Sequence, residues 1–234
     1  MTVMTAGMPG AMSAARPQLI RALNEQLLLG HIRDHGPCSR ADLARLSGLS
    51  KPTVSLALAN VEQAGLIREA GQRIGRPGRS VLLYEIRPEA GFVLGLDVGA
   101  QYIRGALTDL AGEVRARSSA RSHASGGRSR VEELVSLAQD LCGEARLALP
   151  EVTQTVIGSP GIYDARRNAM ALTGGLPGWD RPAVLTRLRE AFGQALVVEN
   201  DVDAAALAER RTATAGRWTA SRSSRSAPAS AWAW

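Results

Sequence analysis

The chain has few of the features that mark secreted, metal-binding or membrane proteins. Its 234 residues include only two cysteines, Cys38 and Cys142, which lie far apart. They form neither a disulfide framework nor a CxxC or His/Cys spacing, so we expect no metal site and no cofactor. No apolar run is long enough to cross a bilayer, and residues 1–16 lack the apolar segment and cleavage site of a signal peptide. These absences favour a cytoplasmic protein.

Lysine is nearly absent, because Lys51 is the only lysine among 28 basic residues. The charge is also unevenly distributed. Residues 1–90 carry 11 basic and 7 acidic side chains, a net charge of +4, whereas residues 91–211 carry 14 and 15, a net charge of −1. A basic N-terminal part beside a nearly neutral body indicates an anionic partner for the N-terminal part. An arginine-rich composition without any such partner is the alternative.

Residues 17–88 have the pattern of three helices followed by a β-hairpin. The preceding residues 1–16 form a leader that we expect to be disordered. Leucine and isoleucine recur at helical spacing in the first helix, which stops at Gly36-Pro37. Two shorter helices follow, joined by a tight glycine-containing turn, as in a helix-turn-helix. The hairpin after them makes this unit a winged helix-turn-helix.

Capping residues mark the ends of the two short helices. Ser39, with Asp42 three residues later, has the spacing of a capping box, and Gly48 suits a left-handed helix end. Ser50 can cap the third helix, where Pro52 lies in the tolerant first turn. These positions predict a short second helix and a third helix that begins next to Lys51.

The third helix and the hairpin are suited to contact DNA. A winged helix inserts the N-terminal end of this helix into the major groove, where its free N–H groups and positive dipole end favour phosphate. Hydroxyl and amino side chains there can bond phosphates or base edges, and arginines of the hairpin can reach the minor groove or the backbone. The predicted DNA-binding residues are Ser50, Lys51, Thr53, Ser55, Arg73, Arg76 and Arg79. A winged helix that contacts protein instead is the alternative.

A stretch with the pattern of two strands, Val93 to Gly112, opens the second part of the chain. An apolar strand runs into Asp97, and an Asp-x-Gly turn leads to a second strand that begins at Tyr102. Such a turn places a carboxylate and flexible backbone at a strand end, where ligands bind in open α/β sheets. We expect residues 115–130 to form an exposed loop or an irregular strand.

Polar residues follow two later strands. Gly158-Ser159-Pro160-Gly161 forms a tight turn after one strand, and Glu199-Asn200-Asp201 ends another. A carboxylate and an amide at a strand end can hydrogen-bond neighbouring hydroxyl groups of a sugar. The alternative is that Asn200 and Asp201 only cap the helix expected at residues 203–210.

Several runs of the chain resemble the ROK family of repressors, uncharacterised reading frames and sugar kinases. In the first part these runs are SRADLARLSGLSKPTVSLALANVEQAGLIREAG and GRPGRSVLLYEI, and in the second part they include TGGLPGW. The resemblance implies an α/β chain with a winged helix-turn-helix over residues 17–88. It also implies, over residues 91–211, the first lobe of a ribonuclease H-like, actin/hexokinase-type ROK domain that binds sugar.

The resemblance also implies a function and its site residues. It implies a homodimeric transcriptional regulator, usually a repressor of carbohydrate-metabolism genes, that binds a double-stranded DNA operator and senses a sugar or sugar phosphate. Gly161, Asn200 and Asp201 are the implied sugar-binding residues. Asp201 also matches the position of the general base in the family's kinases, while Asp97 and Gly99 are the remnant of a phosphate motif.

Departures from the family pattern argue against kinase activity. The kinases carry Asp-x-Gly-Gly-Thr, but here Ala100 adds a Cβ where phosphate would lie and Gln101 replaces the small hydroxyl residue. The second phosphate loop is not found after residue 209. Residues 212–234 contain no acid and no apolar periodicity, so we expect a disordered, aberrant tail that results from a frameshift or truncation, with a natural basic tail as the alternative. We therefore expect no enzyme, with an ATP-dependent ROK sugar kinase or a non-functional fragment as alternatives.

Overall fold

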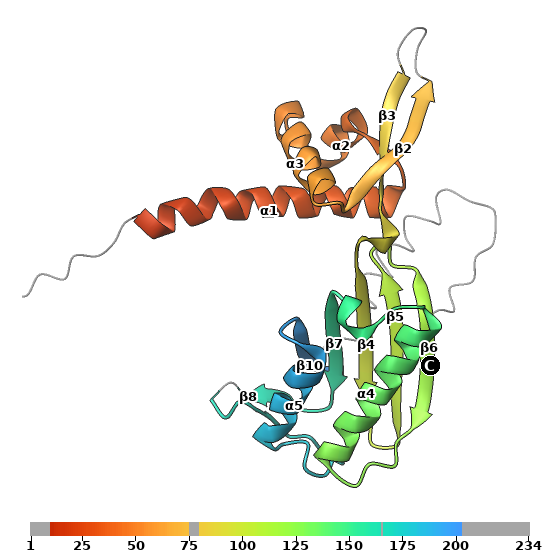
Figure 1. Cartoon of the computed structure of the whole chain (residues 1–234). Helices are drawn as coiled ribbons and strands as arrows, with labels where there is room; N and C mark the ends of the chain where they lie inside the picture. The colour runs from red at the N-terminus through yellow and green to blue at the C-terminus, as the bar shows by residue number, and fades with distance from the viewer. Residues whose placement is uncertain (1–9, 75–79, 165, 203–234) are drawn as a thin grey trace, which may run out of the picture. The chain divides into compact units, whose positions relative to one another are not determined.

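The computed structural model of the protein describes residues 10–74, 80–164 and 166–202 (Figure 1). The chain divides into two compact units. The first comprises the residues up to 91 together with the turn 109–113, and the second comprises residues 92–108 and the chain from 114 onward. Each unit has an apolar core of its own. No helix in the described ranges has the length and apolar character needed to cross a membrane.

The first unit is a winged helix-turn-helix, as the sequence predicted. Its described helices are α1 (Gly10–His35), α2 (Arg40–Ser47) and α3 (Lys51–Gln63), with a short 3₁₀ helix, η1 (Pro88–Ala90), after the hairpin. Its antiparallel sheet has the spatial order β1 (Cys38–Ser39), β3 (Ser80–Ile86) and β2 (Ile67–Ile74). The core joins all three helices to this sheet and includes Leu28, Ile32, Leu43, Val54, Leu58, Val61 and Tyr84.

Local hydrogen bonds fix the ends of the short helices. Ser39 and Asp42 form the predicted reciprocal capping box at the start of α2, and Gly48 ends this helix with a left-handed φ of 71°. The Ser50 side chain accepts a hydrogen bond from the Thr53 backbone N–H at the start of α3. These contacts confirm the predicted caps.

Helix α1 begins earlier than the sequence pattern predicted. It starts at Gly10, so the expectation of a disordered leader was wrong for residues 10–16, while residues 1–9 lie outside the described part of the chain. The sequence before Pro17 is rich in alanine, the residue with the highest helix propensity. That propensity offsets the backbone hydrogen bond that Pro17 cannot donate inside the helix.

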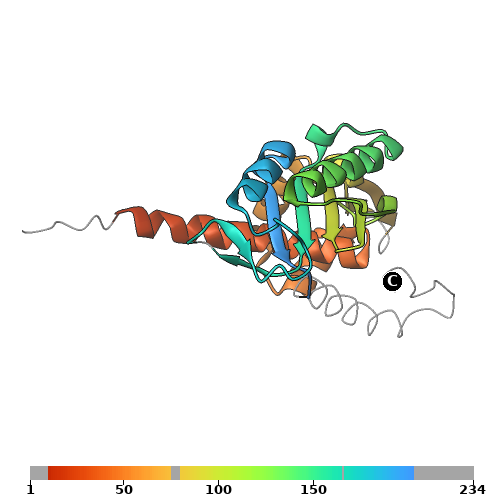
Figure 2. The same cartoon turned by 90° about the horizontal axis from the view of Figure 1, so that it is seen from below.

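The second unit is a mixed sheet with two helices on one face (Figure 2). Its strands have the spatial order β10 (Leu196–Asn200), β7 (Gln154–Ser159), β4 (Phe92–Val98), β5 (Tyr102–Asp109) and β6 (Val114–Arg121). Strands β4, β7 and β10 are parallel, and β5 pairs antiparallel with β6. The remaining described elements are α4 (Gly127–Glu144), η2 (Leu149–Glu151), the hairpin of β8 (Ile162–Asp164) and β9 (Ala169–Ala171), and α5 (Pro182–Phe192).

Residues 115–130 are more regular than an exposed loop. Strand β6 pairs with β5 over most of its length, with one irregularity between Leu107 and Thr108, and α4 already begins at Gly127. The expectation of a loop was therefore wrong for β6. The alternative expectation, an irregular strand, agrees better with its pairing, which has one irregularity. As the last strand of the sheet, β6 can point its serine and arginine side chains to solvent while its backbone pairs with β5.

Candidate functional site

The start of α3 presents polar side chains around a capped first turn. Lys51 and Ser55 are exposed, whereas Val54 between them is buried in the core. The hydroxyl oxygens of Ser50 and Thr53 lie 2.8 Å apart, within hydrogen-bonding distance. The predicted residues of α3 therefore lie together on one end of the helix, but the Ser50 and Thr53 hydroxyls already have each other as partners.

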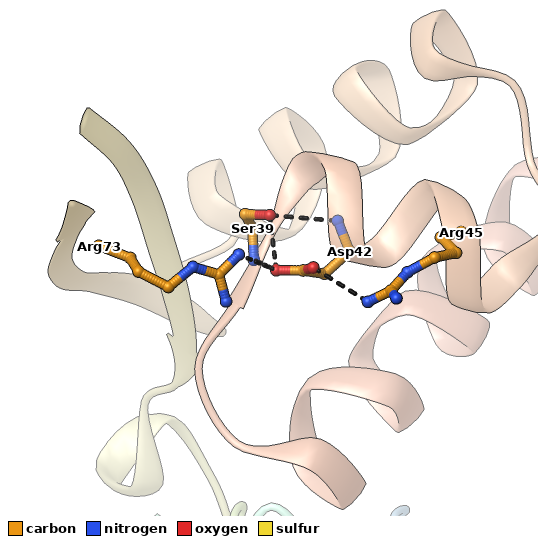
Figure 3. Close-up of polar contacts among 4 residues, drawn as sticks. All are labelled: Ser39, Asp42, Arg45 and Arg73. Carbon is orange, nitrogen blue, oxygen red and sulfur yellow. Dashed lines mark hydrogen bonds and ion pairs between the residues drawn. The ribbon is translucent and has the colours of Figure 1, made fainter. Parts of the chain in front are cut away.

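The wing arginine Arg73 contacts α2 (Figure 3). Its Nη2 donates to Asp42 Oδ2 at 2.9 Å, and Arg45 Nη2 donates to Asp42 Oδ1 at 3.2 Å. The Ser39 hydroxyl donates to the same carboxylate at 2.7 Å. The Ser39 hydrogen bonds and the Arg73 guanidinium hold the pKa of Asp42 below its usual value, with the Ser39 side chain as the largest cause. Arg73 thus connects strand β2 to the capping box of α2.

Two arginines of α2 extend this polar surface beyond the predicted residues, and α3 adds an exposed leucine. Arg45 is 77% exposed, and Arg40 is exposed with its Nη2 donating to the Tyr84 hydroxyl at 2.8 Å. Leu56 on α3 is 56% exposed. Neither arginine was predicted, because α2 was interpreted from its caps and the DNA contacts were assigned to α3 and the hairpin. The predicted residues Arg76 and Arg79 lie outside the described ranges.

In the second unit, the carboxyl ends of three parallel strands meet at one edge of the sheet. Asp97 at the end of β4 lies in register with Gly158 of β7, whose neighbour Ser159 lies in register with Asn200 of β10. A Cβ placed on Gly158 would lie 3.8 Å from the Cα of Asp201 and 3.9 Å from Asp97 Oδ1. The predicted residues of the phosphate motif and the sugar site, distant in sequence, therefore converge.

Asn200 links two of these strand ends. Its Nδ2 donates to the carbonyl oxygen of Gly161 at 2.7 Å. Gly161 has a φ of +104°, and a Cβ there would collide with the carbonyl oxygen of Ala171, so this turn requires glycine. The backbone N–H of Val202 donates to the side chains of both Asn200 and Asp201 at 2.9 Å. The Asn200 side chain therefore accepts a hydrogen bond from the backbone of Val202 and donates one to the Gly161 turn. The helix expected at residues 203–210 lies outside the described residues.

A buried tryptophan supports the same turn. Trp179 and Ser159 are both 0% exposed, and Trp179 Nε1 donates to Ser159 Oγ at 2.7 Å. The Ser159 hydroxyl in turn donates to the carbonyl oxygen of Pro160 at 3.1 Å. This chain of hydrogen bonds ties the turn after β7 to the core of the second unit.

Two arginines that the sequence analysis did not identify hold the remnant of the phosphate motif. Arg104 Nη1 pairs with Asp97 Oδ2 at 3.0 Å. Arg130, only 2% exposed, donates from Nη1 to the carbonyl oxygen of Gly99 at 2.8 Å. A Cβ on Gly99 would lie 2.8 Å from the carbonyl oxygen of Tyr102, so glycine is needed for this close approach. The described residues contain no group of His, Cys, Asp and Glu able to hold a metal ion.

The chain and its fold have counterparts among known proteins. The model of the ROK family matches residues 93–220, which is more than half of the chain. The chain belongs to the ROK family. A model of the MarR family matches residues 23–77, which lie within the winged helix-turn-helix. The two matches confirm the predicted family and fold class.

Curated relatives of this ROK protein include xylose repressors. The putative xylose repressor of Caldicellulosiruptor sp. (strain Rt8B.4) is 30% identical over 197 residues, which cover 82% of this chain and 48% of the relative. The xylose repressor of Bacillus spizizenii (strain ATCC 23059 / NRRL B-14472 / W23) is 27% identical over 203 residues, 85% of this chain and 51% of the relative. The chain thus spans about half the length of these relatives.

A solved structure shows the same fold. It is a ROK family transcriptional regulator described as a homologue of the E. coli MLC protein, and it matches with a TM-score of 0.63 at 23% identity. The match covers 82% of this chain and 48% of that chain. This protein therefore shares the fold of that regulator over the matched part of that chain.

Proposed function

We propose that this ROK protein is a DNA-binding transcriptional regulator, a repressor of carbohydrate-metabolism genes that senses a sugar or sugar phosphate. The observation that carries the proposal is the exposed, polar start of α3 in a winged helix, in the same chain as a ROK-type strand-end site. The relatives named as xylose repressors support the same role. We place this function in the cytoplasm and assign it to a homodimer.

DNA binding would use the start of α3 and the wing. Lys51 supplies an exposed positive charge beside the first turn, whose N–H groups and dipole also favour phosphate. Ser55 lies one turn further along the exposed side, where it can contact a base edge. Arg73, tied to Asp42, orients the hairpin that carries the predicted contacts Arg76 and Arg79.

The test is binding of the full chain to the DNA upstream of its own gene and of neighbouring sugar genes. Lys51→Ala should weaken binding and reduce the slope of log affinity against log salt by about one, because one phosphate contact is lost. Arg128→Ala is the matched control, since it removes one positive charge from an exposed side chain of the second unit. Failure of the wild-type chain to bind any of these regions at low salt would refute the proposal.

The effector would bind where the parallel strands end. Asn200 and Asp201 offer an amide and a carboxylate to adjacent sugar hydroxyls, and Gly161 leaves its backbone accessible beside them. Asn200→Ala removes both the amide and the hydrogen bond to Gly161, so it should abolish binding of the effector. Calorimetric titration with a panel of pentoses, hexoses and their phosphates, xylose included, measures this.

A sugar kinase is the second candidate, favoured by the convergence of Asp97 and Asp201 around Gly158. Asp201 matches the base position of the family's kinases, but Asp97 is paired with Arg104 and is followed by Ala100 instead of glycine. We therefore assign no phosphoryl transfer to this chain. Turnover of ATP with any sugar of the same panel would overturn that assignment.

A further inference from the structure

Helix α1 carries apolar side chains on two opposite faces. On the inner face, Leu28 and Ile32 are 0% and 1% exposed, and Glu25 accepts a hydrogen bond from Asn60 of α3 at 2.6 Å. The outer face carries four large apolar side chains with exposed fractions between 41% and 61%: Leu19, Ile20, Leu23 and Leu27. Single exposed leucines are ordinary, but a contiguous apolar stripe marks an interaction surface.

The spacing of this outer face matches a coiled-coil seam. Ile20, Leu23, Leu27 and Gly30 follow one another at intervals of three, four and three residues, as the a and d positions of a heptad do. A concavity of about 340 Å³ lies on the same face, lined by Leu23, Gln26, Leu27, Gly30, His31 and Asp34. A Cβ added to Gly30 would meet nothing within 4 Å, so the seam has an open position at one end and a large side chain at the other.

We infer that this face of α1 binds the same face of a second copy of the chain, with the two helices antiparallel about a twofold axis. Pairing centred on residue 25 places Leu23 opposite Leu27 of the second copy and Ile20 opposite Gly30 of the second copy. Each isoleucine then enters the open position beside a glycine, and the leucines fill the middle. Parallel pairing would oppose glycine with glycine and isoleucine with isoleucine, which leaves a gap at one end of the seam.

The charges around the seam suit self-pairing. Glu25 is the only acidic or basic residue between residues 22 and 32 apart from His31, and it points to α3 on the inner face. Burial and the neighbouring His35 lower the pKa of His31, which disfavours its charged form. Asp34 at the rim is paired with Arg33 at 2.9 Å. Over residues 22–32, a twofold axis therefore brings no like charges together across the seam.

The role that we give to this pairing, which is to supply two DNA-binding helices, rests on the proposed function. Helix-turn-helix regulators read two half-sites with two copies related by a twofold axis. Pairing through α1, which packs against α3 in the same unit, would give the assembly a second reading helix. The pairing itself needs no DNA, so it can be tested without an operator.

The experiment is sedimentation velocity of the full chain over a range of concentrations without DNA. We expect a dimer that Leu23→Glu with Leu27→Glu weakens at least a hundredfold, because both side chains are exposed in the protomer but buried in the pair. Leu172→Glu, at a position 80% exposed in the second unit, is the matched control and should leave the dimer unchanged. Gly30→Leu, which fills the open position without adding charge, should also weaken the dimer.

The register is tested by disulfide formation. Mixing Leu23→Cys chains with Leu27→Cys chains should give the mixed disulfide faster than either pure one, since the native Cys38 and Cys142 are buried. A monomer at every concentration, a dimer that withstands both the glutamate pair and Gly30→Leu, or faster formation of the 23–23 disulfide would each overturn the inference. A chain that binds DNA as a monomer would overturn the pairing and the assignment to a homodimer, but not the DNA-binding function. A dimer that does not bind DNA would overturn the DNA-binding function but not the pairing.

Discussion

The two candidate sites of this chain are built in opposite ways. The polar surface of the first unit follows six consecutive residues at the start of one helix, Ser50 to Ser55. The strand-end site of the second unit draws on three parallel strands and brings Asp97 and Asp201 near Gly158. The first site is centred on one helix and its cap, with arginines of α2 and β2 beside it, and the second depends on the packing of a whole sheet. A mutation in the core of the second unit should therefore impair the strand-end site while the start of α3 keeps its structure.

The largest expected effect is that of Trp179→Ala on the second unit. It empties the place of a fully buried side chain and removes the hydrogen bond to Ser159, so the free energy of unfolding of that unit should fall by about 3–5 kcal/mol. Sugar binding should be lost, while DNA binding at low temperature should persist. Trp179→Phe is the control, because it keeps most of the volume and should cost less. Denaturant unfolding followed by circular dichroism measures the stability of both variants. An equal loss of stability in Trp179→Ala and Trp179→Phe would contradict the prediction.

A smaller effect is expected for Asp42→Ala in the first unit. The substitution removes the capping box and the partner of Arg73, which should cost about 0.5–2 kcal/mol. Affinity for DNA should also fall, because the wing loses a link to α2. Asp42→Asn keeps an oxygen that can accept the hydrogen bonds but removes the charge, so its cost should be smaller. A free energy of unfolding that is unchanged in both variants would show that the contact between Asp42 and Arg73 does not stabilise the hairpin.

The same carboxylate predicts a dependence on pH. The pKa of Asp42 is lower in the folded chain than its usual value near 4, so its contribution to stability is present above about pH 4. The contribution is lost as the pH falls through the folded pKa. Unfolding of the wild type should become easier over this acid range, and the curve of Asp42→Asn should be flatter. Parallel curves would contradict the assignment.

The smallest expected effect on stability is that of Leu56→Ala. This side chain is 56% exposed on α3, so the free energy of unfolding should change by no more than about 0.5 kcal/mol. Affinity for the operator should change instead, because the side chain lies on the surface that we propose to face DNA. Unfolding and DNA titration of the same variant decide the question. A loss of stability without a loss of affinity would place Leu56 in a packing contact.

In the first unit, sequence patterns predicted the helices, the hairpin and the caps at Ser39, Gly48 and Ser50, because each depends on neighbours in the chain. The same patterns did not predict β1, a two-residue strand that exists only through its pairing with β3. They also assigned Arg73 to DNA alone, while its contact with Asp42 links residues 31 positions apart.

In the second unit, the sequence identified the strand-end residues but not what holds them. Asp97 and Asn200 follow apolar strands and could be recognised from that position. Arg104, Arg130 and Trp179 act through contacts that only the folded sheet brings together. Pairing with β5 likewise made a strand of residues whose composition favoured a loop.

The sequence by itself determined the main helices and the hairpin of the first unit, the helix caps and the family, since hydrophobic period and capping are properties of short stretches. The tertiary structure decided which distant segments come together: Asp97 and Asp201 both lie near Gly158, and Arg73 pairs with Asp42. It also left an apolar stripe on the outer face of α1. The reason is physical. Local hydrogen bonds depend on residues three or four positions apart, whereas sheet order and burial depend on contacts between segments that the sequence keeps distant.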